Sequence, residues 1–287
     1  METSAHIINL RPLSRTFGAE LLGVDLLAEH DPEVIDAVRK LWREHKLLLF
    51  RGQKLDEEHL VRFSRHFGPL EIHLRREYLS KKHPEVLLVS NVKESGKKLG
   101  ILADREVGWH YDQIYLQRPA VGSLLFSVKI PPAGGNTYFA DMHAAYESLP
   151  EETKNQIRER HAIQSYEAFN RVYSEPTSRE QKEKTPDVSH PMVRTHPYTG
   201  RKALYICPGM TTRIVGMPED ESDALLRELF DWCTRPEFVY THEWREGDAL
   251  LWDNACTMHR RDPFDSRHDR LLKRTTILPD PEKAKPF

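Results

Sequence analysis

The sequence predicts a mainly β protein with peripheral α-helices, of the antiparallel sandwich or jelly-roll type. Short runs rich in aliphatic, aromatic and β-branched residues recur along the chain, separated by turn residues. Few stretches show helical spacing of apolar residues, and most of the last hundred residues again have strand character. No long repeat or low-complexity linker marks a boundary, so residues 1–287 are expected to form a single domain.

Near the amino end, apolar residues at helical spacing predict a helix over residues 31–45, with Asp31 as N-cap and Pro32 in the first turn. A short buried strand follows at 46–50, and a second helix ends on Gly68. Two further helices are expected at 151–161 and 219–233. Strands are expected at 85–92, 107–115, 121–130, 136–141, 202–207, 238–244, 248–254 and 270–278.

One stretch resists assignment to a helix or strand. Residues 174–190 are charged and predicted to be a structureless loop, long enough to be mobile or to act as a lid.

Composition excludes several classes of partner. The chain has 42 Lys and Arg against 44 Asp and Glu, so no overall basic field draws nucleic acid or an anionic membrane. Its three cysteines lack C-x-x-C spacing, which argues against a disulfide framework or a thiolate zinc site. The amino end lacks the apolar run of a signal peptide, and no apolar run approaches the ~20 residues that span a bilayer. A cytoplasmic protein with a small-molecule partner is therefore expected.

A possible metal site lies in the stretch VGWHYDQIY, where His110 and Asp112 would share one face of a strand. The motif is weak by itself, because 15 His and 44 acidic residues give roughly two His-x-acid pairs by chance, and His83/Glu85 is the other. Apolar and aromatic surroundings favour the first pair, since a buried carboxylate needs a partner. His259, after the apolar strand ending in WDN, is the candidate third ligand of a facial 2-His-1-carboxylate site.

Two arginines on the last strand point to anion binding. Arg270 and Arg274 are four residues apart and lie on one strand face. Their Cα atoms are then about 13 Å apart, at ~3.3 Å per residue, which is too far to hold one carboxylate symmetrically. We expect them to serve different groups.

Five blocks together resemble one known family. WHYD, GGNTYFADMHAAYESLP, VRTHPYTGRKALYI, WDNACTMHR and RLLKRTTIL, in this order, are similar to the Fe(II)/2-oxoglutarate dioxygenases of the taurine and 2,4-dichlorophenoxyacetate dioxygenase family. The resemblance covers nearly the whole chain and implies a double-stranded β-helix, the jelly-roll variant. It implies Fe(II), 2-oxoglutarate and O2 as cofactors, and a reaction that hydroxylates a small anionic substrate while 2-oxoglutarate is converted to succinate and CO2.

The resemblance also assigns roles. His110, Asp112 and His259 would bind iron, and Arg270 with Thr137 would hold the distal carboxylate of 2-oxoglutarate. Arg274 would lie near the metal-binding end of the cosubstrate and the anionic group of the prime substrate. Without the resemblance, Thr137 is equally well a plain strand residue after a Gly-Gly turn.

The prime substrate is left open. His73 aligns with a histidine that contacts the substrate anion in sulfonate-using relatives. Glu106 and Met210 replace residues typical of taurine enzymes, so an alkylsulfonate other than taurine, an alkyl sulfate or an aryloxyalkanoate is expected. The remaining pocket candidates are equally well core residues; they are Met210, Tyr115, Tyr166 and Phe169.

Two further expectations concern activity and assembly. The alternative function is a non-catalytic ligand-binding or sensor protein on the same fold, which has no need for the complete residue set. Relatives commonly form dimers or tetramers, so a homo-oligomer is expected.

Overall fold

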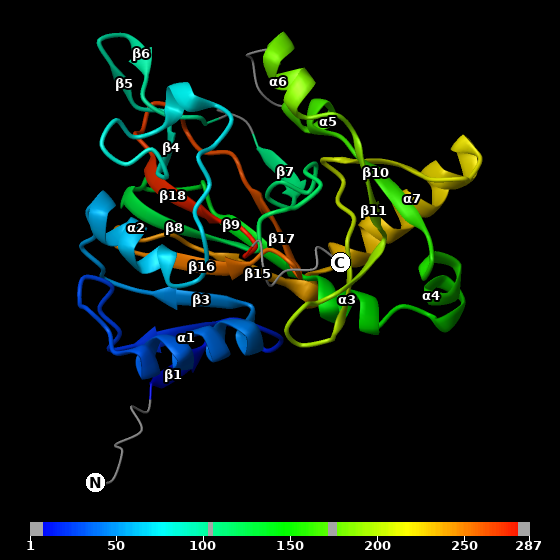
Figure 1. Ribbon diagram of the computed structural model, residues 1–287, viewed down its shortest axis with the longest axis horizontal. Helices are drawn as coiled ribbons and strands as arrows, with labels where there is room; N and C mark the ends of the chain where they lie inside the picture. Colours follow the sequence, from blue (N-terminus) through cyan, green and yellow to red (C-terminus); the bar gives the residue numbers. More distant parts are fainter. Residues whose placement is uncertain (1–7, 103–105, 172–176, 281–287) are drawn as a thin grey trace, which may run out of the picture.

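The computed structural model describes residues 8–102, 106–171 and 177–280. Its largest sheet has seven strands in the spatial order β1-β2-β3-β16-β8-β18-β4 (Figure 1). Neighbouring strands are antiparallel except for β2 and β3, which are parallel. The strands of this sheet are β1 (Asn9–Pro12), β2 (Ala19–Leu22), β3 (Leu47–Phe50), β16 (Ala249–Asp253), β8 (Gly122–Lys129), β18 (Leu271–Ile277) and β4 (Leu87–Ser90).

A second, four-stranded antiparallel sheet has the order β15-β9-β17-β7. Its strands are β15 (Val239–His242), β9 (Thr137–Asp141), β17 (Thr257–Arg261) and β7 (Val107–His110). The two sheets share a buried apolar cluster, in which the Phe139 ring from β9 lies 5.6 Å from the Trp252 ring on β16. The sheets therefore pack face to face, as in a β-sandwich. The predicted mainly β class with peripheral helices is confirmed at this level.

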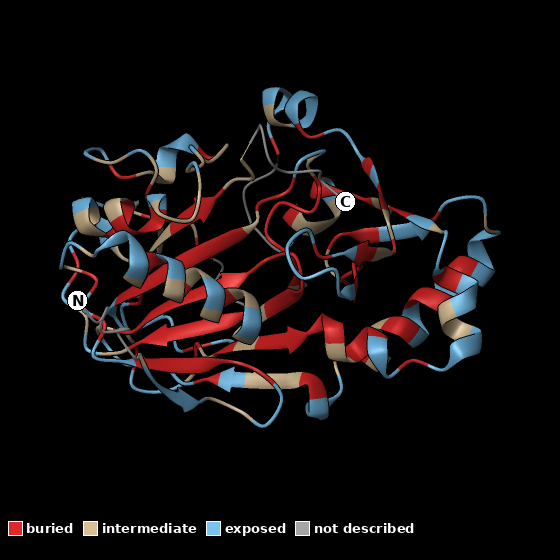
Figure 2. Cartoon of the chain, turned by 60° about the horizontal axis from the view of Figure 1, so that its bottom comes forward, coloured by how far each residue is buried: buried red, intermediate tan, exposed pale blue. Residues whose placement is uncertain are grey.

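Helices α1 (Pro32–His45) and α2 (Glu57–Arg65) cover the outer face of the large sheet, where α1 contacts β3 and β16 and α2 contacts β18. Trp42 of α1 packs over Gly122, where a Cβ would come within 2.5 Å of the indole, so a larger residue does not fit. The strands beneath are almost entirely buried, whereas both helices expose their outer side (Figure 2). The apolar residues of each helix lie along one face, and their packing against the strands holds the helix on the sheet.

A further apolar core lies beyond the end of the two sheets and includes helices on the right in Figure 1. Its strands form a three-stranded sheet, β11-β10-β14, and a two-stranded one, β12-β13. The elements of this region are α3 (Met142–Glu147), α4 (Glu151–Ile157), β10 (His161–Gln164), α5 (Tyr166–Asn170), α6 (Arg179–Lys184), β11 (Val188–Pro191), β12 (Val193–Thr195), β13 (Lys202–Leu204), β14 (Thr211–Ile214), α7 (Glu219–Cys233) and η2 (Pro236–Phe238). A small hairpin, β5 (Lys93–Glu94) and β6 (Lys97–Lys98), and the turn η1 (Arg76–Tyr78) complete the described elements.

Several boundaries differ from the sequence-based expectations. Helix α2 ends at Arg65 rather than at Gly68, because the next two N–H groups, of His66 and Phe67, bond to carbonyl oxygens three residues back and form turns. Gly68 packs closely just past the last strand, where a Cβ would lie 2.8 Å from the Leu278 carbonyl oxygen. Asp31 is the N-cap of α1, but its side chain makes no capping hydrogen bond. Helix α4 ends at Ile157, since His161 already pairs in a sheet.

The expectation of a structureless run at 174–190 is wrong for most of its length. Residues 174–176 lie outside the described residues, but α6 and β11 occupy much of the remainder. A capping box between Ser178 and Gln181 begins α6, and Arg179 pairs with Glu183 at 2.9 Å, one turn later. Local pairs of this kind stabilise a charged helix that has no apolar face to bury. Mobility of this segment stays a prediction.

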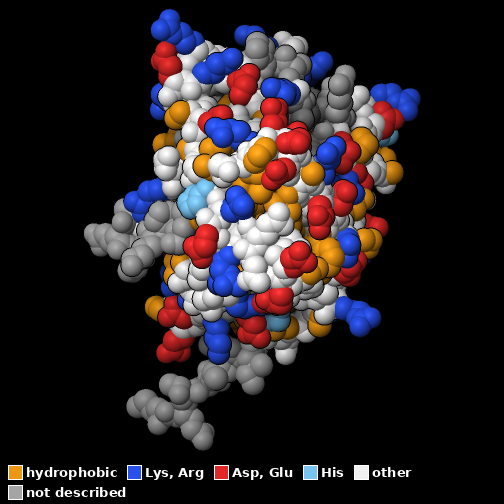
Figure 3. Space-filling model, turned by 90° about the vertical axis from the view of Figure 1, so that its right-hand side faces the viewer, with side chains coloured by type: hydrophobic (Ala, Val, Ile, Leu, Met, Phe, Trp, Pro, Cys, Tyr) orange, Lys and Arg blue, Asp and Glu red, His pale blue; other side chains and the backbone are white. Residues whose placement is uncertain are grey.

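The surface carries no extended patch of one charge on the face seen in Figure 3, where acidic and basic side chains are interspersed. This agrees with the formal net charge of −2. All three cysteines are buried and free, as expected. Among the described helices, none combines the length and the apolar character needed to cross a bilayer.

Candidate active site

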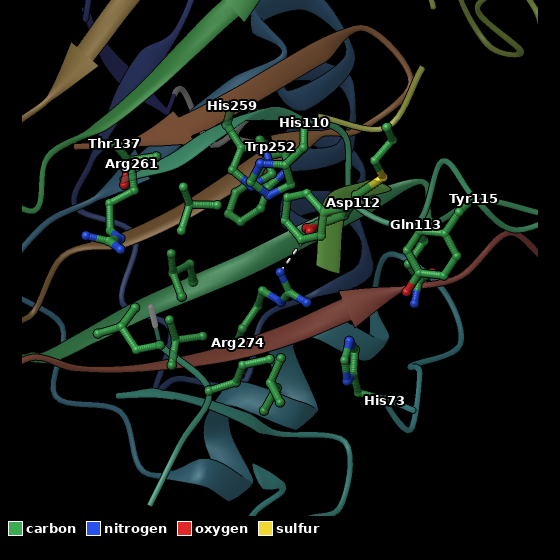
Figure 4. Close-up of a pocket in the computed structure, with 18 of the residues that line it drawn as sticks. His73, His110, Asp112, Gln113, Tyr115, Thr137, Trp252, His259, Arg261 and Arg274 are labelled. Atoms are coloured by element: carbon green, nitrogen blue, oxygen red, sulfur yellow. Dashed lines mark hydrogen bonds and ion pairs between the residues drawn. The ribbon is translucent and has the colours of Figure 1, made fainter. Parts of the chain in front are cut away.

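All eleven candidate site residues named from the sequence line a single pocket that opens between the two sheets (Figure 4). They come from elements far apart in the chain, including β7, β9, β17 and the strand β18. The pocket also contains three polar or aromatic residues that the sequence did not single out: Gln113, Trp252 and Arg261. Its remaining lining is aliphatic and is supplied by Leu87, Val89, Ile101, Leu102, Val107 and Leu125.

His110, Asp112 and His259 come together in the middle of the pocket (Figure 4). Strands β7 and β17 pair so that His110 and His259 are direct neighbours, with ring centroids 4.2 Å apart. The expected strand over 107–115 ends at His110, so Asp112 does not share a strand face with it. The turn after the strand brings the carboxylate back, and the three side chains place their ligand atoms within 4.8 Å of one another. Sequence spacing identified the residues but not the turn.

Hydrogen bonds hold two of these side chains ready for a metal ion. His110 Nδ1 lies 2.8 Å from the Gly108 carbonyl oxygen and must donate to it, which leaves Nε2 as a lone-pair donor. The Asp112 carboxylate accepts from Arg274 at 2.8 Å and from Ser123 at 2.7 Å. Asn254 fixes the Asp112 backbone from both sides, accepting from its N–H at 3.0 Å and donating to its carbonyl oxygen at 2.7 Å. The WDN segment that precedes the hairpin therefore supports the carboxylate ligand.

The electrostatics of the three residues suit a divalent cation. Burial lowers the pKa of both His110 and His259, so each imidazole stays neutral and can offer a lone pair. Burial alone would raise the pKa of Asp112, but the Arg274 guanidinium and the two histidines outweigh it and keep the carboxyl ionised. Two neutral imidazoles and one carboxylate, with the rest of the coordination sphere open to the pocket, are the donor set typical of non-haem Fe(II).

A second cluster of metal-ligand residue types, His196, Asp253 and Cys256, has a structural explanation. His196 Nε2 lies 2.8 Å from Asp253 Oδ2, and its Nδ1 accepts from the backbone N–H of Thr199 at 3.1 Å. The other Asp253 oxygen accepts from the Ala255 N–H at 2.9 Å. Because both imidazole nitrogens and both carboxylate oxygens are already hydrogen-bonded, this cluster stabilises the turn between β16 and β17.

One end of the pocket is built for an anion. Arg270 is 1% exposed and donates to the Gly135 carbonyl oxygen at 3.1 Å. Burial, together with the nearby positive charge of Arg261, lowers the pKa of Arg270 to about 9. The Thr137 hydroxyl accepts from Trp244 Nε1 at 2.9 Å, so its own proton is available to an acceptor in the pocket. Asp262 offsets part of the charge of these two buried guanidinium groups, and an anion such as a carboxylate bound in the pocket would offset more. Sequence reasoning missed Arg261 because it is half of the pair Arg260-Arg261, which is typical of an exposed surface.

Arg274 contacts a different group from Arg270, as their spacing predicts. Its guanidinium is bound to the metal-ligand residue Asp112, whereas that of Arg270 donates to the Gly135 carbonyl oxygen, two residues before Thr137. The side chain of Arg274 is 14% exposed.

The opposite end of the pocket is aromatic. The rings of Tyr115 and Tyr166 lie 4.7 Å apart, and the Phe169 ring lies 4.8 Å from that of His110, so Phe169 of α5 faces a metal-ligand residue. Met210 also lines this end. These four residues therefore pack in or against the apolar core and line the pocket at the same time, and their contact with a substrate stays a prediction. Burial lowers the pKa of His73 at this end to about 3, and the charge of Arg274 acts in the same direction.

Arg75, which sequence reasoning also missed, connects the segments that form this end of the pocket. It is 3% exposed, donates to Asn170 Oδ1 at 2.6 Å and lies 3.4 Å from the Tyr166 hydroxyl. Its backbone N–H donates to His73 Nδ1 at 3.1 Å. The segment that carries His73 and the helix that carries Tyr166 are thus joined through one buried arginine.

Comparison with known proteins agrees with this site. Residues 9–276 match the model of the family described as "Taurine catabolism dioxygenase TauD, TfdA family". The chain is 36% identical to the alpha-ketoglutarate-dependent 2,4-dichlorophenoxyacetate dioxygenase of Cupriavidus pinatubonensis, over 94% of this chain and 97% of the relative. It is 33% identical to the (S)-phenoxypropionate/alpha-ketoglutarate-dioxygenase of Sphingobium herbicidovorans, over 95% and 96% of the two chains.

A solved structure gives the same result for the fold. The crystal structure of AAD-2 in complex with Mn(II) and N-oxalylglycine superimposes with a TM-score of 0.81 at 32% identity, covering 96% of this chain and 99% of that one. With a matching family model over most of the chain and relatives aligned from end to end, the chain belongs to the TauD, TfdA family and is an α-ketoglutarate-dependent dioxygenase.

Proposed function

We propose that His110, Asp112 and His259 bind Fe(II) and that the surrounding residues hold 2-oxoglutarate. The observation that carries the proposal is the juxtaposition, in one pocket, of this open donor set and a buried anion site around Arg270. When bound together, Fe(II) and 2-oxoglutarate would activate O2, and 2-oxoglutarate would be converted to succinate and CO2.

We further infer that the two facing sheets form a double-stranded β-helix, and that the enzyme is a cytoplasmic homo-oligomer.

The protein's own part is binding, orientation and charge neutralisation. Arg270 neutralises the distal carboxylate of 2-oxoglutarate, with Arg261 adding positive charge and the Thr137 hydroxyl donating a hydrogen bond. Arg274 keeps the Asp112 carboxylate ionised and in position. The aliphatic wall beside these residues excludes water, which strengthens each of these interactions.

The prime substrate is proposed to be a small organic acid with an aromatic or bulky aliphatic body. The aromatic end, with Tyr115, Tyr166, Phe169 and Met210, offers ring faces and an adaptable thioether for such a body. The relatives named above act on aryloxyalkanoates. Hydroxylation of the carbon between ether oxygen and carboxylate would give a hemiacetal, which collapses to a phenol and a 2-oxoacid.

The test is turnover by the iron-loaded protein. Anaerobic addition of Fe(II) and 2-oxoglutarate should produce the weak visible charge-transfer band of the chelate. Admission of O2 with a panel of aryloxyalkanoates, alkyl sulfates and alkylsulfonates should then release succinate and, for an ether substrate, an equal amount of phenol. The Asp112→Ala variant is the matched control and should give neither band nor succinate. A wild type that binds the panel acids but releases no succinate would instead indicate a binding or sensor protein.

A further inference from the structure

Gln113 is a buried amide whose hydrogen-bonding groups are unused. It is 3% exposed and lines the pocket directly after the candidate ligand Asp112. Within the described residues, neither its Nε2 nor its Oε1 has a hydrogen-bond partner. Buried polar side chains are almost always hydrogen-bonded, so an amide left open toward a pocket indicates a group that a ligand would bind.

The backbone at this position supports the same conclusion. Gln113 has a φ of 58°, in the left-handed region that glycine adopts without cost and that a long side chain rarely adopts. Its carbonyl oxygen accepts from the Leu116 N–H at 2.9 Å, which closes the turn after β7. A glycine would form this turn with less strain. The strained residue keeps a side chain that contributes no hydrogen bond to the described fold, which is the pattern of strain held at a functional site.

The neighbours of Gln113 define what it would bind. Figure 4 shows Gln113 and Tyr115 at the end of the pocket near His73, away from Thr137 and Arg261. Because His73 Nδ1 accepts from the Arg75 backbone N–H, its Nε2 carries the proton and is a donor. The positive charge of Arg274 is already engaged by Asp112. This end of the pocket therefore presents neutral N–H donors.

Glu71 is an acidic neighbour of this end of the pocket. Burial raises the pKa of its carboxyl to about 7, against the opposing effects of the Arg274 charge and of the Gln113 amide. An incoming anion would meet a carboxyl that is partly protonated at neutral pH.

We propose that Gln113 determines substrate specificity by donating its amide N–H to an oxyanion oxygen of the prime substrate, beside the Nε2–H of His73. This inference rests on the proposed function and deepens it, since it names the group that selects an acid over a neutral analogue. Carboxylate, sulfate and sulfonate oxygens share the required acceptor chemistry.

The test compares variants of similar size. Gln113→Met removes both hydrogen-bonding groups at nearly constant length, and Gln113→Glu replaces the donor with a charge. Binding is measured by calorimetry of protein loaded with Mn(II) and N-oxalylglycine, titrated with 2,4-dichlorophenoxyacetate, with hexyl sulfate and with the methyl ester of the first. Turnover is followed as succinate release.

We expect Gln113→Met to weaken binding of the preferred anion about 10- to 100-fold, the effect of losing one hydrogen bond to a charged group. Gln113→Glu should weaken it more, because like charges then face each other. Binding of the neutral ester should change less than threefold, and the KM for 2-oxoglutarate less than twofold. The anion that is affected, carboxylate or sulfate, identifies the head group.

Equal losses for acid and ester in Gln113→Met would overturn the inference, because they indicate only a structural role. So would unchanged acid binding in a variant that still binds N-oxalylglycine normally. A wild type that forms no succinate with any panel acid would refute the proposed function itself, which separates the two failures.

Discussion

Replacement of Arg270 by methionine should weaken 2-oxoglutarate binding and, at the same time, stabilise the metal-free protein. The guanidinium is almost completely buried, and among the described residues its one hydrogen bond goes to the backbone carbonyl oxygen of Gly135. Removal of one member of a buried, hydrogen-bonded charge pair costs about 3–4 kcal/mol, so the KM for 2-oxoglutarate should rise roughly 100- to 1,000-fold. Steady-state succinate release at varied 2-oxoglutarate measures this directly.

The stability change follows from the depressed pKa. Burial lowers the pKa of Arg270 from 12.5 to about 9, which corresponds to up to about 5 kcal/mol of unfavourable charge burial at neutral pH. Loss of the hydrogen bond to Gly135 offsets about 1–2 kcal/mol of the gain. Because a base with a depressed folded-state pKa destabilises the protein at every pH below that pKa, the net gain of about 3 kcal/mol should be complete at pH 7 and shrink above pH 9.

Calorimetry of the apoprotein checks the second half of the prediction. A gain of about 3 kcal/mol should raise Tm by roughly 6 °C for a chain of this size. Arg267→Met is the control, since Arg267 pairs with Asp265 on the surface and should change neither quantity. An Arg270→Met variant with an unchanged KM for 2-oxoglutarate would refute the anion-site assignment, and a variant that is less stable than wild type would show that Arg270 is a satisfied structural residue.

Three further predictions concern residues around the site. Ser123→Ala removes a hydrogen bond to Asp112 and should lower Fe(II) affinity about 10- to 100-fold, as measured by competition with a chelator, without changing Tm by more than a few degrees. Burial raises the pKa of Glu71 from 4.5 to about 7. The protonated carboxyl therefore stabilises the folded protein fully below pH 4.5, and this contribution is lost as the pH rises through 7. In urea unfolding, Glu71→Gln should raise the free energy of unfolding by up to about 3 kcal/mol at pH 8 and leave it unchanged at pH 4. A pH-independent gain would contradict this account. Arg75→Met removes the hydrogen bond to Asn170. The KM for the prime substrate should rise at least 10-fold, and the KM for 2-oxoglutarate should change less than twofold. Parallel increases in both KM values would argue against a positioning role for Arg75.

The residues of the candidate site could be predicted from the amino-acid sequence, because their chemistry is rare in combination. Side chains at 110, 112, 259, 137 and 270 were chosen by type, local pattern and resemblance, and all of them line the same pocket. Long amphipathic segments such as α1 were equally predictable, since apolar residues three or four positions apart lie on one face only when the segment is an α-helix.

The surroundings of those residues could not be predicted, because they depend on how distant segments pack in the folded chain. Short strands such as β10 and β11 form because they pair with segments distant in the chain, and α6 forms through its own charge pairs inside a run that was expected to be a loop. The same holds for Gln113 and Arg75, whose roles depend on a turn and on partners that no local pattern reveals. Residue type is a local property, whereas the burial, strain and hydrogen bonding that give a residue its role arise only when distant segments pack against it.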